Sequence, residues 1–216
     1  MLFRSVNFET FAGQKKLVGE GGVLRKAVAS GNIPSIILWG PPGVGKTTLA
    51  RIIANLLERP FYTLSAVHSG VKDVRQTIEQ ARSQRFFTAP NPILFIDEIH
   101  RFNKSQQDSL LGAVEEGVVT LIGATTENPS FEVVPALLSR CQVYVLEHLA
   151  QEDLVYLVDL ALEKDEYLRE KDIEIESYDA MLRYAGGDAR KLYNILELIA
   201  ADVPPGERLT ITDELV

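Results

Sequence analysis

Gly40-Pro41-Pro42-Gly43-Val44-Gly45-Lys46-Thr47 matches the pattern G-x-x-x-x-G-K-[ST] of a phosphate-binding loop at every fixed position. A short apolar run, residues 35–39, precedes this loop and predicts a buried strand. After the loop, apolar residues recur on one face of a predicted helix: Leu49, Ile52, Ile53, Leu56 and Leu57. The motif therefore stands in the order strand, loop, helix that its chemistry requires.

The residue types of the loop predict how it would hold a phosphate chain. Its glycines let the backbone curl so that several N–H groups point inward, and the N-terminus of the following helix adds partial positive charge. Lys46 can reach the β- and γ-phosphates, Thr47 can ligate Mg²⁺, and Thr48 completes the predicted nucleotide-binding set. We therefore expect ATP and Mg²⁺ as ligands.

Strands and helices alternate along residues 35–146, which predicts an α/β fold with a parallel sheet covered by helices on both faces. Further apolar strands are expected at residues 61–65, 93–96, 118–123 and 142–146. Helices are expected at residues 23–29, 71–83, 103–116 and 135–139. Ligands of such sheets bind at the carboxyl ends of the strands, where the phosphate loop, Asp97-Glu98 and Thr125-Thr126 all fall.

A second domain is predicted after residue 147, and no strand is expected in it. Three stretches with helical spacing, residues 154–162, 178–185 and 192–199, predict a small three-helix lid over residues 148–203. This leaves residues 1–147 as the nucleotide-binding domain. Residues 204–216 are expected to be a linker into a C-terminal region that this sequence lacks, with the start of a further helix at residues 211–215.

Composition indicates a soluble globular protein, with 46% hydrophobic and 24% charged residues. No apolar run reaches the roughly 18 residues of a membrane helix, so no membrane partner is expected. The single cysteine fits a reducing, cytoplasmic compartment. Most of the net charge of −8 falls in residues 151–176, which leaves the rest of the chain close to neutral and able to carry local basic surfaces.

The strand ends carry side chains suited to phosphoryl transfer. Asp97 can hold Mg²⁺ through its water shell, and Glu98 can take a proton from an attacking water. Thr126 is the first candidate to position that water, with Thr125 second. Arg140 and Arg190 stand at element boundaries, where each is either a surface ion pair or a cation for the γ-phosphate.

Together these motifs resemble those of the AAA+ ATPases over nearly the whole chain. Residues 40–47 look like their Walker A motif, residues 93–98 like Walker B, and Ala124-Thr125-Thr126 like sensor 1. Leu138-Ser139-Arg140-Cys141 is similar to the Ser-Arg-Cys motif of clamp loaders, and residues 186–190 resemble sensor 2.

Within the AAA+ proteins, three long stretches resemble the replication-associated recombination protein A family, relatives of the Werner helicase-interacting protein: residues 64–73, 97–108 and 123–132. The resemblance implies a DNA-stimulated ATPase of stalled replication forks and single-strand/duplex DNA junctions, acting in recombination and repair in the bacterial cytoplasm at the nucleoid. It also implies a single-strand DNA-binding protein as partner and a homotetramer that forms through a C-terminal region. Because the sequence stops at Val216, before such a region, we expect an N-terminal ATPase fragment that can be a monomer.

The resemblance assigns roles to individual residues. Thr126 would sense the γ-phosphate, Arg140 would be the finger offered to the neighbouring subunit's ATP, and Arg190 would contact ATP from the lid of its own subunit. The segment Phe11-Ala12-Gly13-Gln14 resembles the one that packs near adenine in this family. Lys46, Thr47, Asp97 and Glu98 keep the roles that their chemistry already indicates.

Three functions fit these observations. The first is ATP hydrolysis coupled to remodelling of fork DNA, with Lys72, Arg101 and Lys104 as candidate DNA contacts beside the strand ends. The alternative is a clamp-loader-like assembly module whose ATP state controls partner binding, which the Ser-Arg-Cys motif favours. A small-molecule kinase shares the phosphate loop, but the lid, Arg140 and Arg190 fit an assembling ATPase better.

Overall fold

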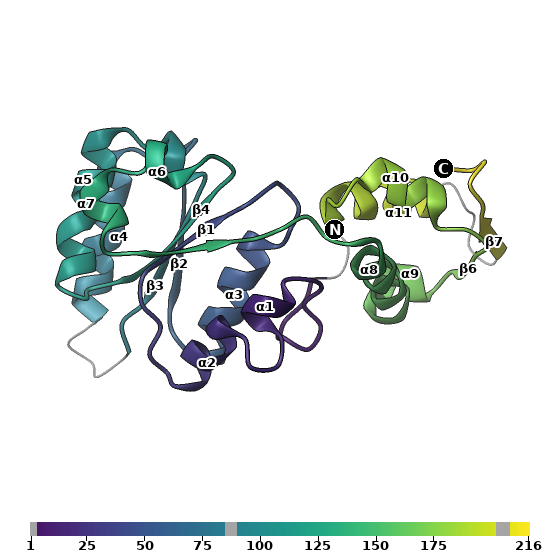
Figure 1. Cartoon of the computed structure of the whole chain (residues 1–216), viewed down its shortest axis with the longest axis horizontal. Coiled ribbons are helices and arrows are strands. Elements are labelled where there is room, and N and C mark those ends of the chain that lie inside the picture. Colours follow the sequence, from purple (N-terminus) through teal and green to yellow (C-terminus); the bar gives the residue numbers. More distant parts are fainter. Residues whose placement is uncertain (1–3, 85–89, 202–207) are drawn as a thin grey trace.

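The computed structural model describes residues 4–84, 90–201 and 208–216. The chain forms two lobes that lie side by side (Figure 1). The larger lobe contains a parallel sheet with helices on both faces, and the described part of the smaller lobe contains four helices and a short two-stranded sheet. The chain passes from the larger lobe to the smaller one between β5 (Gln142–Val145) and α8 (Gln151–Lys164), where the sequence predicts the domain division.

All five strands of the main sheet run parallel, in the order β2-β3-β4-β1-β5. Their bounds are β1 Ile36–Trp39, β2 Phe61–Ser65, β3 Ile93–Asp97, β4 Thr120–Thr125 and β5 Gln142–Val145. The predicted parallel sheet is therefore confirmed. Because parallel strands end at the same edge, the residues that follow β1, β3 and β4 meet there.

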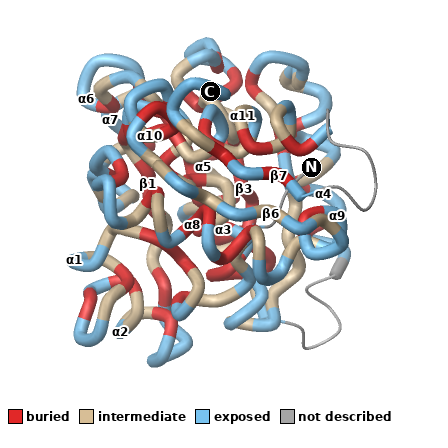
Figure 2. The backbone as a smooth tube through the Cα atoms, turned by 90° about the vertical axis from the view of Figure 1, so that its right-hand side faces the viewer, coloured by how far each residue is buried: buried red, intermediate tan, exposed pale blue. Residues whose placement is uncertain are grey.

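The apolar residues of the strands belong to two separate hydrophobic cores, one on each face of the sheet. In β1, Ile36 and Leu38 belong to the core under α3 (Lys46–Leu56), whereas Ile37 belongs to the core under α4 (Val71–Gln84) and α5 (Lys104–Glu115). Alternate side chains of a strand point to opposite faces, so a strand covered on both faces has to be apolar throughout. Figure 2 shows the buried stretches running through the inside of the molecule, with the outer turns of the helices exposed.

Helices α1 (Lys15–Val18) and α2 (Val23–Ala29) lie beside α3 (Figure 1). Short helical turns follow the strand ends on the way to the next elements: η2 Ile99–Arg101, α6 Pro129–Glu132 and α7 Pro135–Leu138. Gln107 of α5 is buried and joins two of these loops, since its Nε2 donates to the carbonyls of Phe102 and Glu132 and its Oε1 accepts from the N–H of Val134. The loops after β3 and β4 are thus held against one helix.

The smaller lobe contains the three predicted helices, as α8 Gln151–Lys164, α10 Asp179–Ala185 and α11 Ala189–Ala201, with a short α9 Glu166–Arg169. They enclose a core of their own, which includes Val158, Met181 and Leu196. No helix within the described ranges is both long and apolar enough to cross a membrane.

The prediction that strands end at residue 147 is wrong. β6 (Asp172–Ile175) and β7 (Arg208–Ile211) pair in parallel. The expected start of a further helix at residues 211–215 is instead the last residue of β7 followed by a turn. Both segments alternate polar and apolar residues, with Leu209 and Ile211 buried on the inner face. This period of two is typical of a strand with one face buried. The prediction missed it because the surrounding sequence is acidic and has helical spacing.

Candidate nucleotide-binding site

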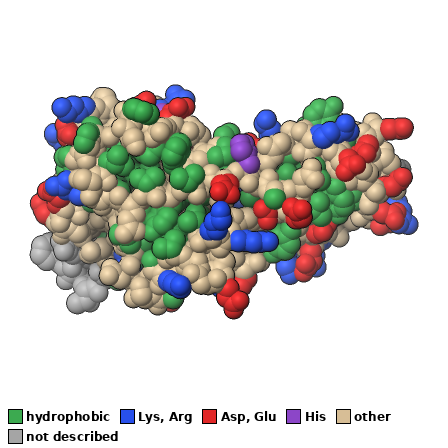
Figure 3. Space-filling model, viewed as in Figure 1, with side chains coloured by type: hydrophobic (Ala, Val, Ile, Leu, Met, Phe, Trp, Pro, Cys, Tyr) green, Lys and Arg blue, Asp and Glu red, His purple; other side chains and the backbone are tan. Residues whose placement is uncertain are grey.

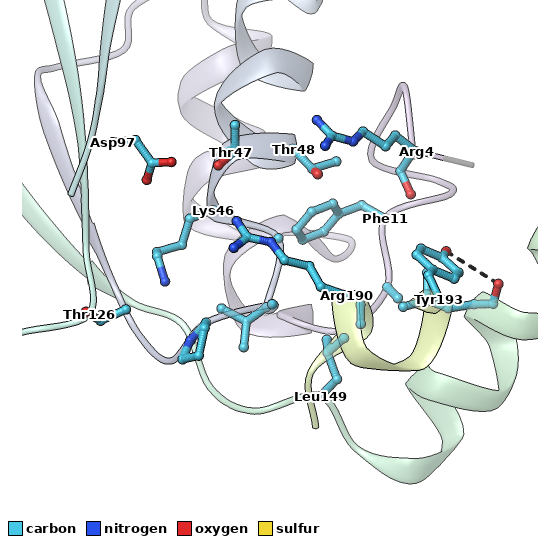
Figure 4. A pocket seen from close by; sticks show the side chains of 18 of the residues that line it. Arg4, Phe11, Lys46, Thr47, Thr48, Asp97, Thr126, Leu149, Arg190 and Tyr193 are labelled. Atoms are coloured by element: carbon cyan, nitrogen blue, oxygen red, sulfur yellow. Dashed lines mark hydrogen bonds between the residues drawn. The ribbon is translucent and has the colours of Figure 1, made fainter. Parts of the chain in front are cut away.

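A cavity of about 730 Å³ lies where the two lobes meet (Figure 4). The phosphate loop, the ends of β3 and β4, the N-terminal segment and α11 all contribute to its wall. Its volume is within the range of small-molecule sites in proteins. Figure 3 shows charged side chains of both signs on the surface at the waist between the lobes.

The phosphate loop has the backbone that its glycines predict. Gly43 and Gly45 have φ values of 72° and 96°, in the left-handed region that side chains with a Cβ rarely adopt. α3 begins at Lys46, directly after Gly45, so the N-terminus of an 11-residue helix opens onto the cavity. Residues 42–48 line the cavity, which gives it the N–H groups and the helix dipole that favour an anion.

Lys46 is a buried cation of the site. Its side-chain Nζ donates to the carbonyl oxygens of Gly40 and Pro41, each at 2.7 Å, and only 8% of the residue is exposed. Burial lowers the pKa of Lys46, and the nearby carboxylates of Glu98 and Asp97 oppose that shift. Gly40 and Pro41 are outside the cavity wall and act here as acceptors that hold the ammonium group in place.

The strand ends bring the predicted acidic and hydroxyl groups to the same cavity. Thr47 of α3 and Asp97 of β3 both line it, and their oxygens are donors of the kind that Mg²⁺ prefers. Glu98 and Thr126 line it as well. Figure 4 shows Asp97 and Thr126 on the sheet side, with Thr47 and Lys46 between them and the lid.

Glu98 has an unusual backbone. Its φ of 55° and ψ of 44° are left-handed, a conformation that costs a residue with a side chain about 1–3 kcal/mol. The carboxylate lies near two nitrogen-bearing side chains, with Oε2 at 3.4 Å from His100 Nε2 and 3.7 Å from Arg101 Nε. Such strain persists where surrounding contacts determine the position of a side chain that serves a site.

The two threonines at the end of β4 differ in their surroundings. Thr126 lines the cavity, whereas Thr125 is fully buried and its hydroxyl hydrogen-bonds to Glu127 and His100. Of the two threonines, Thr126 is therefore the one that a ligand in the cavity could contact.

The N-terminal segment contributes only half of its predicted residues to the cavity. Phe11 and Ala12 line the wall, but Gly13 and Gln14 do not. Gln14 instead lies at the passage between the lobes, where its side chain donates to the carbonyl of Glu147 at 2.7 Å and accepts from its N–H at 3.1 Å. The segment therefore joins the two lobes in addition to lining the cavity.

Helix α11 presents a face to the cavity that the sequence prediction missed, apart from Arg190. Tyr193, Asn194 and Glu197 follow Arg190 at spacings of three, four and seven, so all four lie on one side of the helix. Figure 4 shows Arg190 extending from α11 into the cavity. Tyr193 donates to the carbonyl of Leu157 at 3.4 Å, and burial raises the pKa of its hydroxyl.

Two more residues of the wall, Arg4 and Leu149, also lacked a motif that predicts them. Burial lowers the pKa of Arg4, and the cationic Arg51 and Arg190 lower it further. An anionic ligand would relieve that repulsion.

The lid touches the phosphate loop directly. Asp188, only 8% exposed, accepts hydrogen bonds from the N–H groups of Arg190 and Lys191 and so caps α11. The N–H of Ala189 donates to the carbonyl of Gly43 at 3.2 Å. A Cβ on Gly43 would lie 1.7 Å from Asp188 Oδ1, so only glycine permits this close approach.

Arg140 is outside the cavity of its own chain. It pairs with Glu115 of α5, donates to the carbonyl of Ala136, and keeps 38% of its side chain exposed. Lys72 and Lys104, at the starts of α4 and α5, are exposed as well. Arg101 is exposed but also lines the cavity beside Glu98.

A phosphate loop on a parallel sheet, with an acidic pair at the end of β3 and a helical lid, defines a P-loop protein that takes a nucleoside triphosphate. The model of the ATPase family associated with various cellular activities (AAA) matches residues 36–149. The chain therefore belongs to the AAA family, and the resemblance to replication-associated recombination protein A within that family is confirmed.

Among the relatives, "Replication-associated recombination protein A" of Haemophilus influenzae is 46% identical over 91% of this chain, and that of Escherichia coli K12 is 44% identical over 99%. The matches span 44% and 48% of those two proteins, so the chain covers about half the length of the curated relatives it matches. A point mutant of RuvB from Thermotoga maritima superimposes with a TM-score of 0.78 at 25% identity, over 99% of this chain and 71% of the RuvB chain.

Proposed function

We propose that this chain binds ATP with Mg²⁺ in the cavity between the lobes and hydrolyses it. The observation that carries the proposal is the convergence of Lys46, Thr47, Asp97, Glu98 and Thr126 on one cavity wall. These residues come from three separate elements, and their types supply a phosphate-binding cation, metal ligands, a proton acceptor and a hydroxyl. Membership of an ATPase family supports the same activity.

Each residue has a separate task in this proposal. Lys46 leaves the carbonyls of Gly40 and Pro41 to neutralise the phosphates, and Glu98 takes the proton of the attacking water. Thr47 and Asp97 hold Mg²⁺, which offsets charge on the phosphate oxygens. Thr126 contacts the γ-phosphate from the residue after β4, and Arg190 contacts it from α11. Phe11 and Ala12 pack near the base, while Gly13 and Gln14 support the segment from outside the cavity.

Glu98→Gln should slow turnover strongly while leaving ATP binding intact, because the amide keeps the size of the side chain but cannot accept the proton. We expect ATP hydrolysis to slow at least ~100-fold, the scale of losing a general base. Phosphate release and direct nucleotide titration measure the two properties separately.

Glu58→Gln is the matched control, since Glu58 is an exposed glutamate with a similar left-handed φ of 51° and lies outside the cavity. It should hydrolyse ATP at the unaltered rate. Turnover by Glu98→Gln within a few-fold of the unaltered protein would exclude Glu98 as the base.

For Arg140 we propose action on the ATP of a neighbouring copy. Its exposed guanidinium cannot serve its own cavity from where it lies, and the pair with Glu115 would have to open for it to reach another site. An arginine finger of this kind is worth ~10³–10⁵ in rate.

Mixing two inactive variants tests the finger. Glu98→Gln subunits keep Arg140, and Arg140→Ala subunits keep Glu98, so a mixed assembly contains some complete sites. We predict that each variant alone is inactive as an assembly and that the mixture regains ATP hydrolysis, whereas nucleotide affinity stays normal in Arg140→Ala. A mixture as inactive as its parts, at an assembly mass equal to that of the unaltered protein, would rule out the finger.

The biological setting that we propose is the maintenance of replication forks and recombination. The relatives named for replication-associated recombination support this setting, and the structural likeness to RuvB, a Holliday junction branch migration motor, supports a role on DNA. DNA-stimulated hydrolysis at single-strand/duplex junctions, a homotetramer and a single-strand DNA-binding partner are parts of the same proposal. For DNA contact we propose Lys72 and Lys104, with Arg101 shared between DNA and Glu98.

The salt dependence of DNA binding tests these two lysines. Lys72→Ala/Lys104→Ala should reduce the slope of log K against log salt by about 0.9 for each duplex phosphate that the protein no longer neutralises. Arg101→Ala is measured separately because it also lies beside Glu98. The exposed lysines of α1 and α2 give the control, Lys15→Ala/Lys26→Ala, which should keep the slope of the unaltered protein. Equal slopes for both double variants would remove Lys72 and Lys104 from the interface.

A further inference from the structure

His100 lies between the proposed general base and Thr125, the last residue of β4, which Thr126 follows. Its Nε2 is 3.4 Å from Glu98 Oε2, and its Nδ1 is 3.0 Å from Thr125 Oγ1. The imidazole is mostly enclosed, with 12% of the side chain exposed, and Thr125 is fully buried. No phosphate-binding motif includes His100, and it is not part of the cavity wall.

The hydrogen bonds of Thr125 determine which way the imidazole points. A hydroxyl has one proton to donate and two lone pairs that accept. The Thr125 hydroxyl accepts from the N–H of Glu127 at 2.9 Å, and its one proton can go to the carbonyl of Glu127 at 3.1 Å or to His100 Nδ1 at 3.0 Å. The Glu98 carboxylate can only accept, so a neutral ring contacts it through a protonated Nε2, and Nδ1 then accepts the proton of Thr125.

With Nδ1 committed to Thr125, the ring holds its other nitrogen toward the Glu98 carboxylate. The backbone restricts both partners further, because Glu98 is the left-handed residue that starts η2 and His100 is the second residue of that turn. Arg101 follows on the same turn and approaches the same oxygen, Oε2, at 3.7 Å. Oε2 of Glu98 therefore has two nitrogen neighbours, His100 Nε2 and Arg101 Nε, which restrict where the carboxylate can lie.

We propose that His100 is a positioning residue for Glu98. Thr125 at the end of β4 fixes the imidazole, and the imidazole fixes one oxygen of the carboxylate. Thr125 and Thr126 are adjacent, so a shift of Thr126 on contact with a γ-phosphate also moves Thr125, the hydrogen-bond partner of His100. The position of the Glu98 carboxylate then depends on whether a phosphate occupies the site. This inference rests on the proposed ATP hydrolysis.

Removing either contact of His100 should slow turnover without weakening nucleotide binding. His100→Ala removes both ring nitrogens, and Thr125→Val keeps the shape of Thr125 but lacks the hydroxyl. We expect kcat to fall by about 10- to 100-fold in each, the scale of misplacing a reacting group by about 1 Å, with KM and directly titrated ATP affinity unaltered. Thr125→Ser restores the hydroxyl and should restore kcat. His68→Ala, which removes an exposed imidazole on the turn after β2, should leave kcat unaltered.

The His100→Ala and Glu98→Gln double variant separates positioning from general support of the fold. Once the carboxylate is absent, His100 has no base to position, so single-turnover hydrolysis by Glu98→Gln should be no slower with His100→Ala added. If His100 only supports the local structure, the same fold-loss will appear in both backgrounds.

The outcomes distinguish failure of the proposed ATP hydrolysis from failure of the positioning role of His100. If Glu98→Gln hydrolyses ATP like the unaltered protein, the proposed function fails, whatever the His100 variants do. If Glu98→Gln is slow while His100→Ala and Thr125→Val both keep the unaltered kcat, only the positioning role is overturned. A full fold-loss from His100→Ala in the Glu98→Gln background overturns it as well.

Discussion

The contact between Gly43 and the residues at the start of α11 joins the two lobes, and residues of both lobes line the cavity there. The N–H of Ala189 would be an unpaired donor at the start of a helix, and the carbonyl of Gly43 satisfies it. The carboxylate of Asp188 lies so near Gly43 that a side chain there could not fit. The residue that curls the phosphate loop is therefore also the residue against which the lid closes. Because α11 starts at this contact, Arg190 and Tyr193 are directed into the cavity.

The same cavity holds its charged groups in arrangements that a ligand would change. The Lys46 ammonium is buried and bound to two carbonyls of its own loop, and burial lowers its pKa despite the nearby carboxylates. Glu98 is held in a strained backbone conformation by contacts behind it. A triphosphate offers Lys46 a charged partner in exchange for neutral carbonyls, and charge-assisted hydrogen bonds are the stronger kind. Binding of a triphosphate would thus fix the phosphate loop, the lid and the Glu98 carboxylate relative to one another.

Much of this could be predicted from the sequence, for identifiable physical reasons. The apolar runs indicated the strands because a sheet covered on both faces needs continuous apolar residues, and parallel order followed from the alternation with helices. Parallel order in turn placed Asp97, Glu98 and Thr126 beside the phosphate loop. The small sheet of β6 and β7 was missed because its strands alternate polar and apolar residues, without a continuous apolar run, and lie outside the alternation of strands and helices. The contact of Gln14 between the lobes was not predicted because its partner, the backbone of Glu147, is 133 residues away and leaves no local signal. The cavity face of α11 carries polar residues at helical spacing from Arg190, a pattern that an ordinary solvated helix face shares.

The most direct test of the account is a crystal structure of the protein with Mg²⁺ and a non-hydrolysable ATP analogue. The account predicts the phosphates within the curl of residues 43–47, with Lys46 Nζ moved from the carbonyls of Gly40 and Pro41 onto phosphate oxygens and the base between Phe11 and α11. A nucleotide bound elsewhere, or phosphates in the loop while Lys46 stays on those two carbonyls, would contradict it.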